Sequence, residues 1–137
     1  MMPAGKYYVG DLCYVINDDA TWAELCDLMF PPESEGRSVD GEYTLKDGRR
    51  FANYSTQYGD GLYPSNIGSN LSVDSGSIGC MLVSDITDAD EARMKSLGAV
   101  YEFGTDFVTG GCLETGTIQF GRVVVETGDF YEEEYYA

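Results

Sequence analysis

The residues best suited to chemistry lie between Thr56 and Gly79, a stretch with the sequence TQYGDGLYPSNIGSNLSVDSGSIG. It contains two carboxylates, Asp60 and Asp74. A pair of carboxylates can act as general acid and general base, or it can hold a divalent cation. Glycines flank Asp60, and a glycine allows the backbone to come close to a ligand. The stretch is therefore a candidate small-molecule site.

The candidate binding residues in and near this stretch can donate or accept hydrogen bonds, or stack on a ring. They are Tyr58, Asp60, Tyr63, Asp74 and Ser75, with Arg49 and Arg50 as the local cations that an anionic ligand would need. The same residue types also form ordinary turns, because Asp and Ser side chains accept hydrogen bonds from nearby backbone N–H groups. The stretch is either exposed turn structure or a pocket, and the enzymatic form of that pocket is a carboxylate-dependent hydrolase.

The chain contains no histidine. A Ser-His-Asp or Cys-His nucleophile and a His-based zinc hydrolase are therefore excluded. The sequence also has no G-x-x-x-x-G-K-[ST] phosphate loop, no G-x-G-x-x-G before a helix, and no calcium-binding ladder of the D-x-D-x-D-G type. We expect no catalytic residues of these classes, no metal and no cofactor, and the sequence favours a protein that is not an enzyme.

Four cysteines, Cys13, Cys26, Cys80 and Cys112, lie far apart without a C-x-x-C pair. This spacing is atypical of a zinc site. The N-terminal segment MMPAGKYYVGD lacks the apolar core of a secretory signal, and no stretch is apolar enough to span a bilayer. We expect reduced, mostly buried thiols in a soluble, cytoplasmic protein.

Acidic residues dominate the charge, with 24 Asp and Glu against 8 Lys and Arg and a formal net charge of −16. Such a field repels nucleic acid and anionic lipid and attracts basic surfaces, although acidity can also serve solubility alone. Eleven tyrosines are suited to protein interfaces, and tyrosine-rich edges would allow a homo-oligomer. We therefore expect a protein partner with a basic surface, and neither nucleic acid nor a membrane.

The last nine residues form a segment of their own. We expect a single strand-rich domain over 1–128 and an acidic, aromatic tail over 129–137, which is either frayed or a partner contact. The acidic residues of the tail are Asp129, Glu132, Glu133 and Glu134.

Two short helices are predicted among the elements that position these residues. One spans about 19–29, with a capping box of Thr21 and Glu24, and ends before Pro31-Pro32. The other spans about 88–97, with a capping box of Asp88 and Glu91, and Gly98 ends it.

Strands make up most of the remaining chain. The Asp47-Gly48 step predicts a hairpin between 42–45 and 49–54. The segments 6–9 and 12–16 predict a bent strand or two strands that meet at a bulge. Further strands are expected at 71–74, 78–83, 99–103, 106–109, 117–120 and 122–126. The fold class is α+β and strand-rich, with one twisted antiparallel sheet or two packed sheets.

Three segments carry a resemblance. They are Gly10-Asp11-Leu12-Cys13-Tyr14, Gly59-Asp60-Gly61-Leu62-Tyr63 and Val73-Asp74-Ser75-Gly76-Ser77-Ile78-Gly79. Within about the first 80 residues, they resemble a family of small uncharacterised bacterial and phage proteins with GD-x-CY, GDG-x-Y and VDSG-x-IG motifs. The resemblance implies a small accessory protein, plausibly carried by a phage, and no catalytic residue is transferred from it.

Two hypotheses follow from these observations. The first is a non-enzymatic acidic interaction protein, such as a phage-type accessory factor or inhibitor that binds a basic host protein. The second is a pocket centred on residues 56–79, in a ligand-sequestering protein or a carboxylate-dependent hydrolase.

Overall fold

A five-stranded antiparallel sheet forms the middle layer of the computed structural model, which describes residues 1–128. Its order is β2-β3-β6-β1-β7, and the strands are β1 (Gly5–Gly10), β2 (Gly41–Thr44), β3 (Arg50–Ser55), β6 (Ser77–Leu82) and β7 (Ala99–Phe103). Side chains alternate between the two faces of a strand. In β1, Tyr7 and Val9 therefore join the core on one face, and Tyr8 joins a second core on the other.

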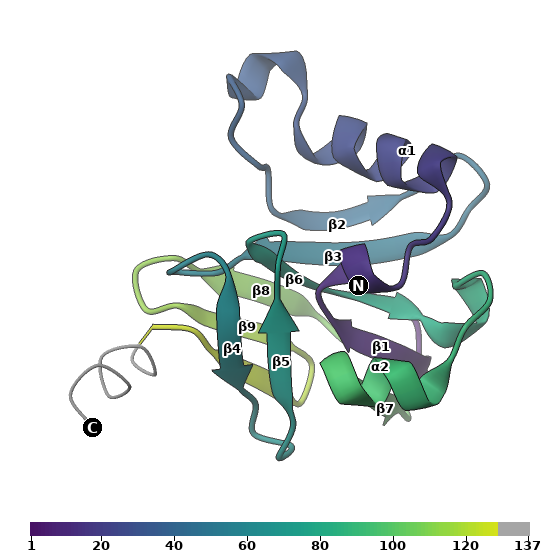
Figure 1. Cartoon of the computed structure of the whole chain (residues 1–137), viewed down its shortest axis with the longest axis vertical. Helices are drawn as coiled ribbons and strands as arrows, with labels where there is room; N and C mark the ends of the chain where they lie inside the picture. The colour runs from purple at the N-terminus through teal and green to yellow at the C-terminus, as the bar shows by residue number, and fades with distance from the viewer. Residues whose placement is uncertain (129–137) are drawn as a thin grey trace.

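Two smaller sheets cover the first face. One has the order β10-β9-β8, with β8 (Thr109–Cys112), β9 (Thr117–Phe120) and β10 (Val123–Glu126). The other is a hairpin of β4 (Gly61–Pro64) and β5 (Asn70–Val73). Figure 1 shows the hairpin in front of these strands. Its inward residues Tyr63, Leu71 and Val73 are buried with Ile118 and Phe120 against the middle sheet.

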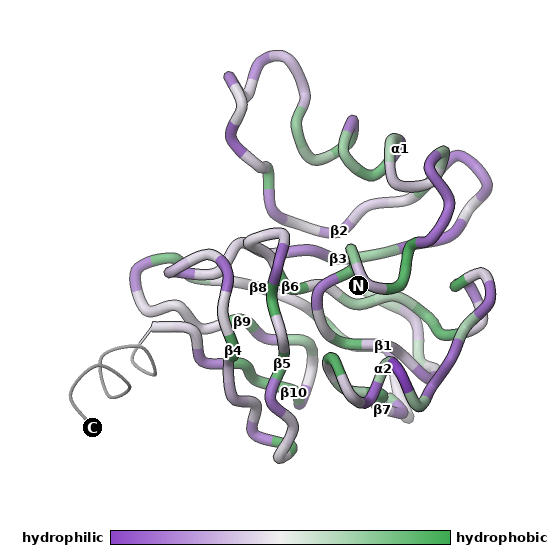
Figure 2. The backbone as a smooth tube through the Cα atoms, in the orientation of Figure 1, coloured by the Kyte–Doolittle hydropathy of each residue, from purple (hydrophilic) through white to green (hydrophobic). Residues whose placement is uncertain are grey.

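Helices cover the second face (Figure 1). They are α1 (Asp19–Met29) and α2 (Glu91–Leu97), with three short 3₁₀ turns η1 (Leu12–Tyr14), η2 (Pro32–Ser34) and η3 (Val83–Asp85). Leu25 and Met29 of α1 and Met94 of α2 pack on Phe51 and Met81 of the sheet. The connection from α1 to β2 is mostly hydrophilic (Figure 2). No helix within residues 1–128 is long and apolar enough to cross a membrane.

The α+β prediction is confirmed, and so are the bounds of the first helix. Its cap differs from the prediction, because the cap is Asp18, whose carboxylate accepts a hydrogen bond from the Thr21 N–H, and Thr21 lies inside the helix. The predicted hairpin is also present, and Tyr43 pairs with Phe51 across it with their rings stacked at 5.3 Å.

Three local predictions are wrong. Residues 12–14 form a 3₁₀ turn instead of a strand, because the Asp11 carboxylate accepts from the Cys13 N–H and caps the turn. The second helix begins at Glu91, because Asp90 is its cap, and Asp88 adopts a left-handed φ of 56° outside it. The strand expected at 106–109 begins only at Thr109.

The 56–79 stretch is more ordered than a loop. The strand β4 was not predicted, and it makes a hairpin with β5 in which Gly61 lies opposite Val73. The tail at 129–137 lies outside the described residues.

Candidate functional site

Asp11 is a fully buried carboxylate at the end of β1. Its Oδ2 accepts hydrogen bonds from the backbone N–H groups of Asp74 and Ser75 at 2.7 and 2.6 Å. Its Oδ1 accepts from the Ser75 hydroxyl at 2.7 Å and from the Cys13 N–H at 3.0 Å. Hydrogen bonds to a charged acceptor are stronger than neutral ones, and they compensate for removing the carboxylate from water.

These bonds bring distant parts of the chain together. Asp11 belongs to the GD-x-CY segment, and its donors Asp74 and Ser75 belong to the VDSG-x-IG segment. The GDG-x-Y segment joins them through the β4–β5 hairpin, which runs antiparallel up to the Gly61–Val73 pair. The three segments therefore form one site.

Asp60 and Asp74 come together at the end of this hairpin. They directly flank the Gly61–Val73 pair, with Asp60 just before β4 and Asp74 just after β5, and both are exposed. Within residues 1–128, neither carboxylate forms an ion pair with a Lys or Arg side chain. The structure thus places two exposed carboxylates at the same end of the hairpin, without a compensating cation from the described residues.

The pKa values of Cys13 and Tyr14 are raised by burial and, to a smaller extent, by nearby carboxylates. Burial raises the pKa of the half-buried Cys13 thiol to about 12, with further contributions from Asp11, Asp74 and Asp60. The pKa of Tyr14 is also raised, first by desolvation and then by Asp74. Because the thiolate is the nucleophilic form of cysteine, Cys13 remains a protonated, unreactive thiol at neutral pH.

Aromatic and apolar side chains accompany the acidic pair. Tyr58 is 43% exposed and Leu62 is 46% exposed. Leu62 lies on the outer side of β4, because neighbouring side chains of a strand point to opposite sides and Tyr63 is buried. Tyr63 has the opposite role, since it is fully buried and its hydroxyl donates to the Gly59 carbonyl at 2.9 Å. We call Tyr14, Tyr58, Asp60, Leu62 and Asp74 the acidic face.

Ser75 is exposed, but its hydroxyl is held by Asp11 at 2.7 Å and lies 3.2 Å from the Ser77 hydroxyl. An activated serine needs a base that can take its proton. Asp11 already accepts three backbone N–H groups, so it acts as a structural acceptor. The site therefore orders the chain and offers no activated nucleophile.

Arg49 and Arg50 contact other parts of the molecule. Arg49 donates to Asp47 at 2.8 Å, to the Thr21 hydroxyl at 2.9 Å and to the Asp85 carbonyl at 3.3 Å. Arg50 donates to the Met1 carbonyl at 2.7 Å and to Glu42 at 3.4 Å. None of these partners belongs to the 56–79 stretch, so the two arginines tie the β2–β3 hairpin to its surroundings.

Asp11 is the residue that sequence reasoning missed. Apart from the Cys13 N–H, its donors belong to Asp74 and Ser75, more than 60 positions away, so no local pattern predicts that it joins these segments. The tail residues Asp129, Glu132, Glu133 and Glu134 fall outside the described part of the chain.

The four thiols are all free, but only Cys80 is buried and Cys112 is exposed. The expectation of mostly buried thiols is therefore wrong, because Cys13 and Cys26 are only partly buried and Cys112 is exposed. It lies at the exposed end of β8, next to the β8–β9 turn. No group of three or more potential metal ligands lies together within residues 1–128.

Comparison with protein families, with curated proteins and with solved structures found no match to this chain. The geometry of the site is therefore the basis for a functional assignment.

Proposed function

We propose that this protein is a non-enzymatic interaction protein whose acidic face binds a basic surface of a protein partner. The observation that carries the proposal is the exposed pair of Asp60 and Asp74, which have no ion-pair partner within residues 1–128. The net charge of −16 supports it, because a field of that sign accelerates encounters with basic surfaces.

The acidic face has the composition of an interface. A lysine or arginine from a partner, placed against Asp60 or Asp74, would gain charge-assisted hydrogen bonds. Tyr14, Tyr58 and Leu62 offer aromatic and apolar contact beside the charges. Tyrosine is enriched at protein interfaces, and charged residues are common at their polar rim.

The fuller form of the proposal is a phage-type accessory factor or inhibitor that acts on a host protein in the cytoplasm. Its support is the resemblance of the three segments and the lack of an activated nucleophile at the site. The field that attracts a basic protein also disfavours nucleic acid and anionic membranes as partners.

A charge-matched pair of variants tests the role of the acidic face. Asp60→Asn with Asp74→Asn removes two charges from the face. Asp27→Asn with Glu33→Gln removes two charges from exposed positions on α1 and η2, where neither side chain makes a hydrogen bond to a described residue. A partner is first captured from host lysate at about 50 mM NaCl and identified by mass spectrometry, and its affinity is then measured by biolayer interferometry.

We expect the face variant to weaken binding at least tenfold, which corresponds to about 1.4 kcal/mol, and the control variant to weaken it much less. Raising NaCl to about 500 mM should weaken wild-type binding steeply, because the Debye length falls below the charge spacing of a typical interface. Equal affinities of the two variants, or binding that is insensitive to salt, would refute the proposal.

The alternative function, a pocket or hydrolase centred on residues 56–79, has less support. Both carboxylates are exposed, Tyr63 is buried, and the Ser75 hydroxyl is bound to Asp11. None of these residues lines the surface hollow between the end of β7 and the β9–β10 turn. Native mass spectrometry of the purified protein would favour this alternative if it detected a small molecule that Asp60→Ala releases.

A further inference from the structure

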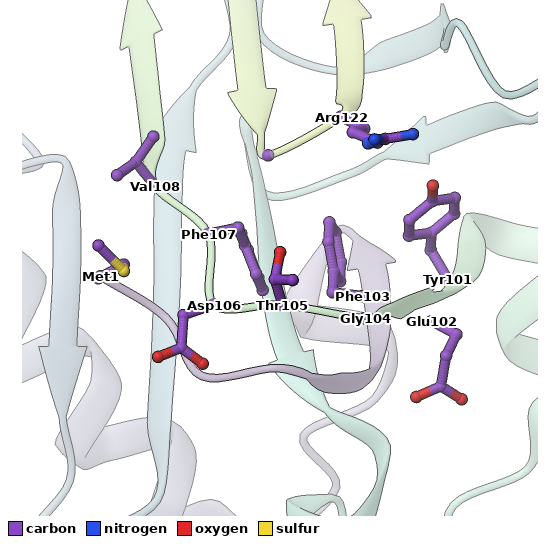
Figure 3. Close-up of a pocket in the computed structure, with 11 residues that line it drawn as sticks. Met1, Tyr101, Glu102, Phe103, Gly104, Thr105, Asp106, Phe107, Val108 and Arg122 are labelled. Carbon is purple, nitrogen blue, oxygen red and sulfur yellow. The ribbon is translucent and has the colours of Figure 1, made fainter.

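A surface hollow of about 510 Å³ lies where the end of β7 meets the segment before β8 and the turn between β9 and β10. Figure 3 shows the side chains that line it. Cavities of a few hundred cubic ångströms are the usual size of small-molecule sites. The hollow shares no residue with the acidic face, so what it binds is independent of the function proposed above.

Aromatic rings form its apolar wall. Phe103 and Phe107 stack with their centroids 3.8 Å apart and their planes 15° apart. Tyr101 meets Phe103 edge to face at 4.7 Å. Both phenylalanines are more than nine-tenths buried, and Tyr7 supports each of them from below through edge contacts. The wall is therefore rigid, which reduces the entropy lost when a ring packs against it.

A cation lies on the rim of this wall. Arg122 is exposed, and its guanidinium has no hydrogen-bond acceptor or ion-pair partner within residues 1–128. Two other arginines, Arg49 and Arg50, are fully engaged with the protein itself. Arg37 and Arg93 likewise have no carboxylate partner within residues 1–128, and Arg122 is the one of these three that lines this hollow.

The acidic residues of the hollow are directed elsewhere. In Figure 3, Glu102 and Asp106 project from the opposite side of the segment to Phe103, Phe107 and the Thr105 hydroxyl. Asp106 also accepts the backbone N–H of Ala4 at 2.9 Å. The side of the hollow that carries the rings thus presents one cation, together with the hydroxyl groups of Thr105 and Tyr101.

We propose that this hollow binds a small molecule that combines a planar apolar ring with an anionic group, either a carboxylate or a phosphate. The ring packs on the wall of Tyr101, Phe103 and Phe107, and the anion pairs with Arg122. Arginine is suited to this role because its planar fork donates two parallel hydrogen bonds to either anion. The net charge opposes an anion at long range, but the Debye length of about 8 Å at physiological ionic strength screens distant acids more than it screens a direct contact.

The experiment uses three one-ring probes with different polar groups. Benzoate and phenyl phosphate carry the two anions, and benzamide is the neutral counterpart of benzoate. Each is titrated into ¹⁵N-labelled full-length protein, and amide shifts are followed by NMR. The variants are Arg122→Gln, which removes the charge, Arg122→Lys, which keeps it, and Arg37→Gln, a matched loss of an exposed arginine outside the hollow.

We expect saturable shifts at residues 101–108 and 121–122 for the anionic probes, with affinities in the millimolar range or tighter, as is usual for one-ring ligands. Benzamide should bind at least fivefold more weakly. The tighter of benzoate and phenyl phosphate identifies the preferred anion. Arg122→Gln should remove the preference for an anion, Arg122→Lys should retain part of it, and Arg37→Gln should leave it unchanged.

Two results would overturn the inference. One is the absence of saturable shifts in the hollow for every probe up to roughly 10 mM, because a ligand that produces no saturable shift at that concentration has negligible affinity. The other is a set of shifts that Arg122→Gln and Arg37→Gln affect equally. The spectra themselves report whether each variant is folded, and the exposed position of Arg122 makes a loss of the fold unexpected.

Discussion

Both carboxylate oxygens of Asp11 accept hydrogen bonds within the protein, which distinguishes Asp11 from Asp60 and Asp74. It is fully buried and accepts four hydrogen bonds, whereas Asp60 and Asp74 are exposed. A buried carboxylate that lost its donors would be strongly unfavourable, and donors that lost the carboxylate would be left unsatisfied. Asp11 therefore maintains the shape of the site, whereas Asp60 and Asp74 remain accessible from solvent.

Replacing Asp11 should therefore affect stability more than replacing an exposed acid. We expect Asp11→Ala to lower the free energy of unfolding by about 3 kcal/mol, because the N–H groups of Asp74 and Ser75 lose a charged acceptor. Asp11→Asn should cost less, since an amide oxygen can still accept from those N–H groups. Urea denaturation at pH 7 measures both, with Asp27→Ala as a control expected within about 0.5 kcal/mol of wild type. A loss no larger than that of the control would show that Asp11 does not hold the turn in place.

Close packing between elements explains a glycine that the sequence alone presents only as part of a motif. Gly79 of β6 lies opposite Gly10 of β1 and Asn53 of β3. A Cβ at Gly79 would lie 2.4 Å from the Ala52 carbonyl oxygen and 2.8 Å from Leu12. Because Gly79 has no side chain, η1 packs directly on the sheet. Asp11 immediately precedes η1, so this packing also fixes the position of Asp11.

Gly79→Ala should therefore destabilise the protein by about 2 kcal/mol, since the atom it meets is backbone and cannot rotate away. Gly110→Ala in β8 is the matched control, because a Cβ there meets nothing within 4 Å. We expect the control to be neutral or slightly stabilising, owing to the reduced entropy of the unfolded chain. Thermal unfolding followed by circular dichroism compares the two variants. Equal midpoints for both would contradict the packing argument.

Local signals predicted the elements whose ends are encoded within a few residues. The helix at 19–29 and the hairpin at Asp47-Gly48 are examples, because a proline pair ends the first and a two-residue turn signal specifies the second. The start of α2 was less well defined, since Asp88 and Asp90 are both good caps and only the left-handed φ of Asp88 decides between them.

Long-range pairing limited the rest of the prediction. The sequence places the candidate residues Asp60 and Asp74 within one stretch, but their position at the same end of the β4–β5 hairpin depends on a four-residue strand with a proline. The roles of Asp11 and Arg122 could not be predicted locally, because the Asp74 and Ser75 donors of Asp11 and most of the surroundings of Arg122 come from segments far away in sequence. Such information is available only from the folded chain.

The whole molecule carries far more negative than positive charge, and this excess acts on its stability. The ion pairs within residues 1–128 are few and at least partly exposed, and exposed pairs contribute little. Repulsion among the remaining acids favours expansion of the chain, and salt screens that repulsion.

Added NaCl should therefore stabilise the protein. Between about 20 mM and 500 mM, we expect Tm to rise by roughly 3–5 °C, which corresponds to about 1 kcal/mol for a chain of this size. Differential scanning fluorimetry measures the shift, and KCl at equal ionic strength should give the same value if screening is the cause. A Tm that falls with salt would mean that local ion pairs outweigh the overall repulsion.

The strand order also bears on how quickly the protein acquires its structure. β1 precedes the other strands of this sheet in the sequence, yet it lies between β6 and β7, with Val9 opposite Cys80 on one side and opposite Ala99 on the other. Such pairings between distant parts of the chain are associated with folding in milliseconds to seconds, because loop closure must precede the contacts that reward it. Until residue 103 has been synthesised, the apolar side chains of β1 have no complete sheet to join. Nascent chains therefore depend on their charge to stay apart, and the excess of acidic over basic residues along the sequence supplies a repulsion that limits aggregation during synthesis.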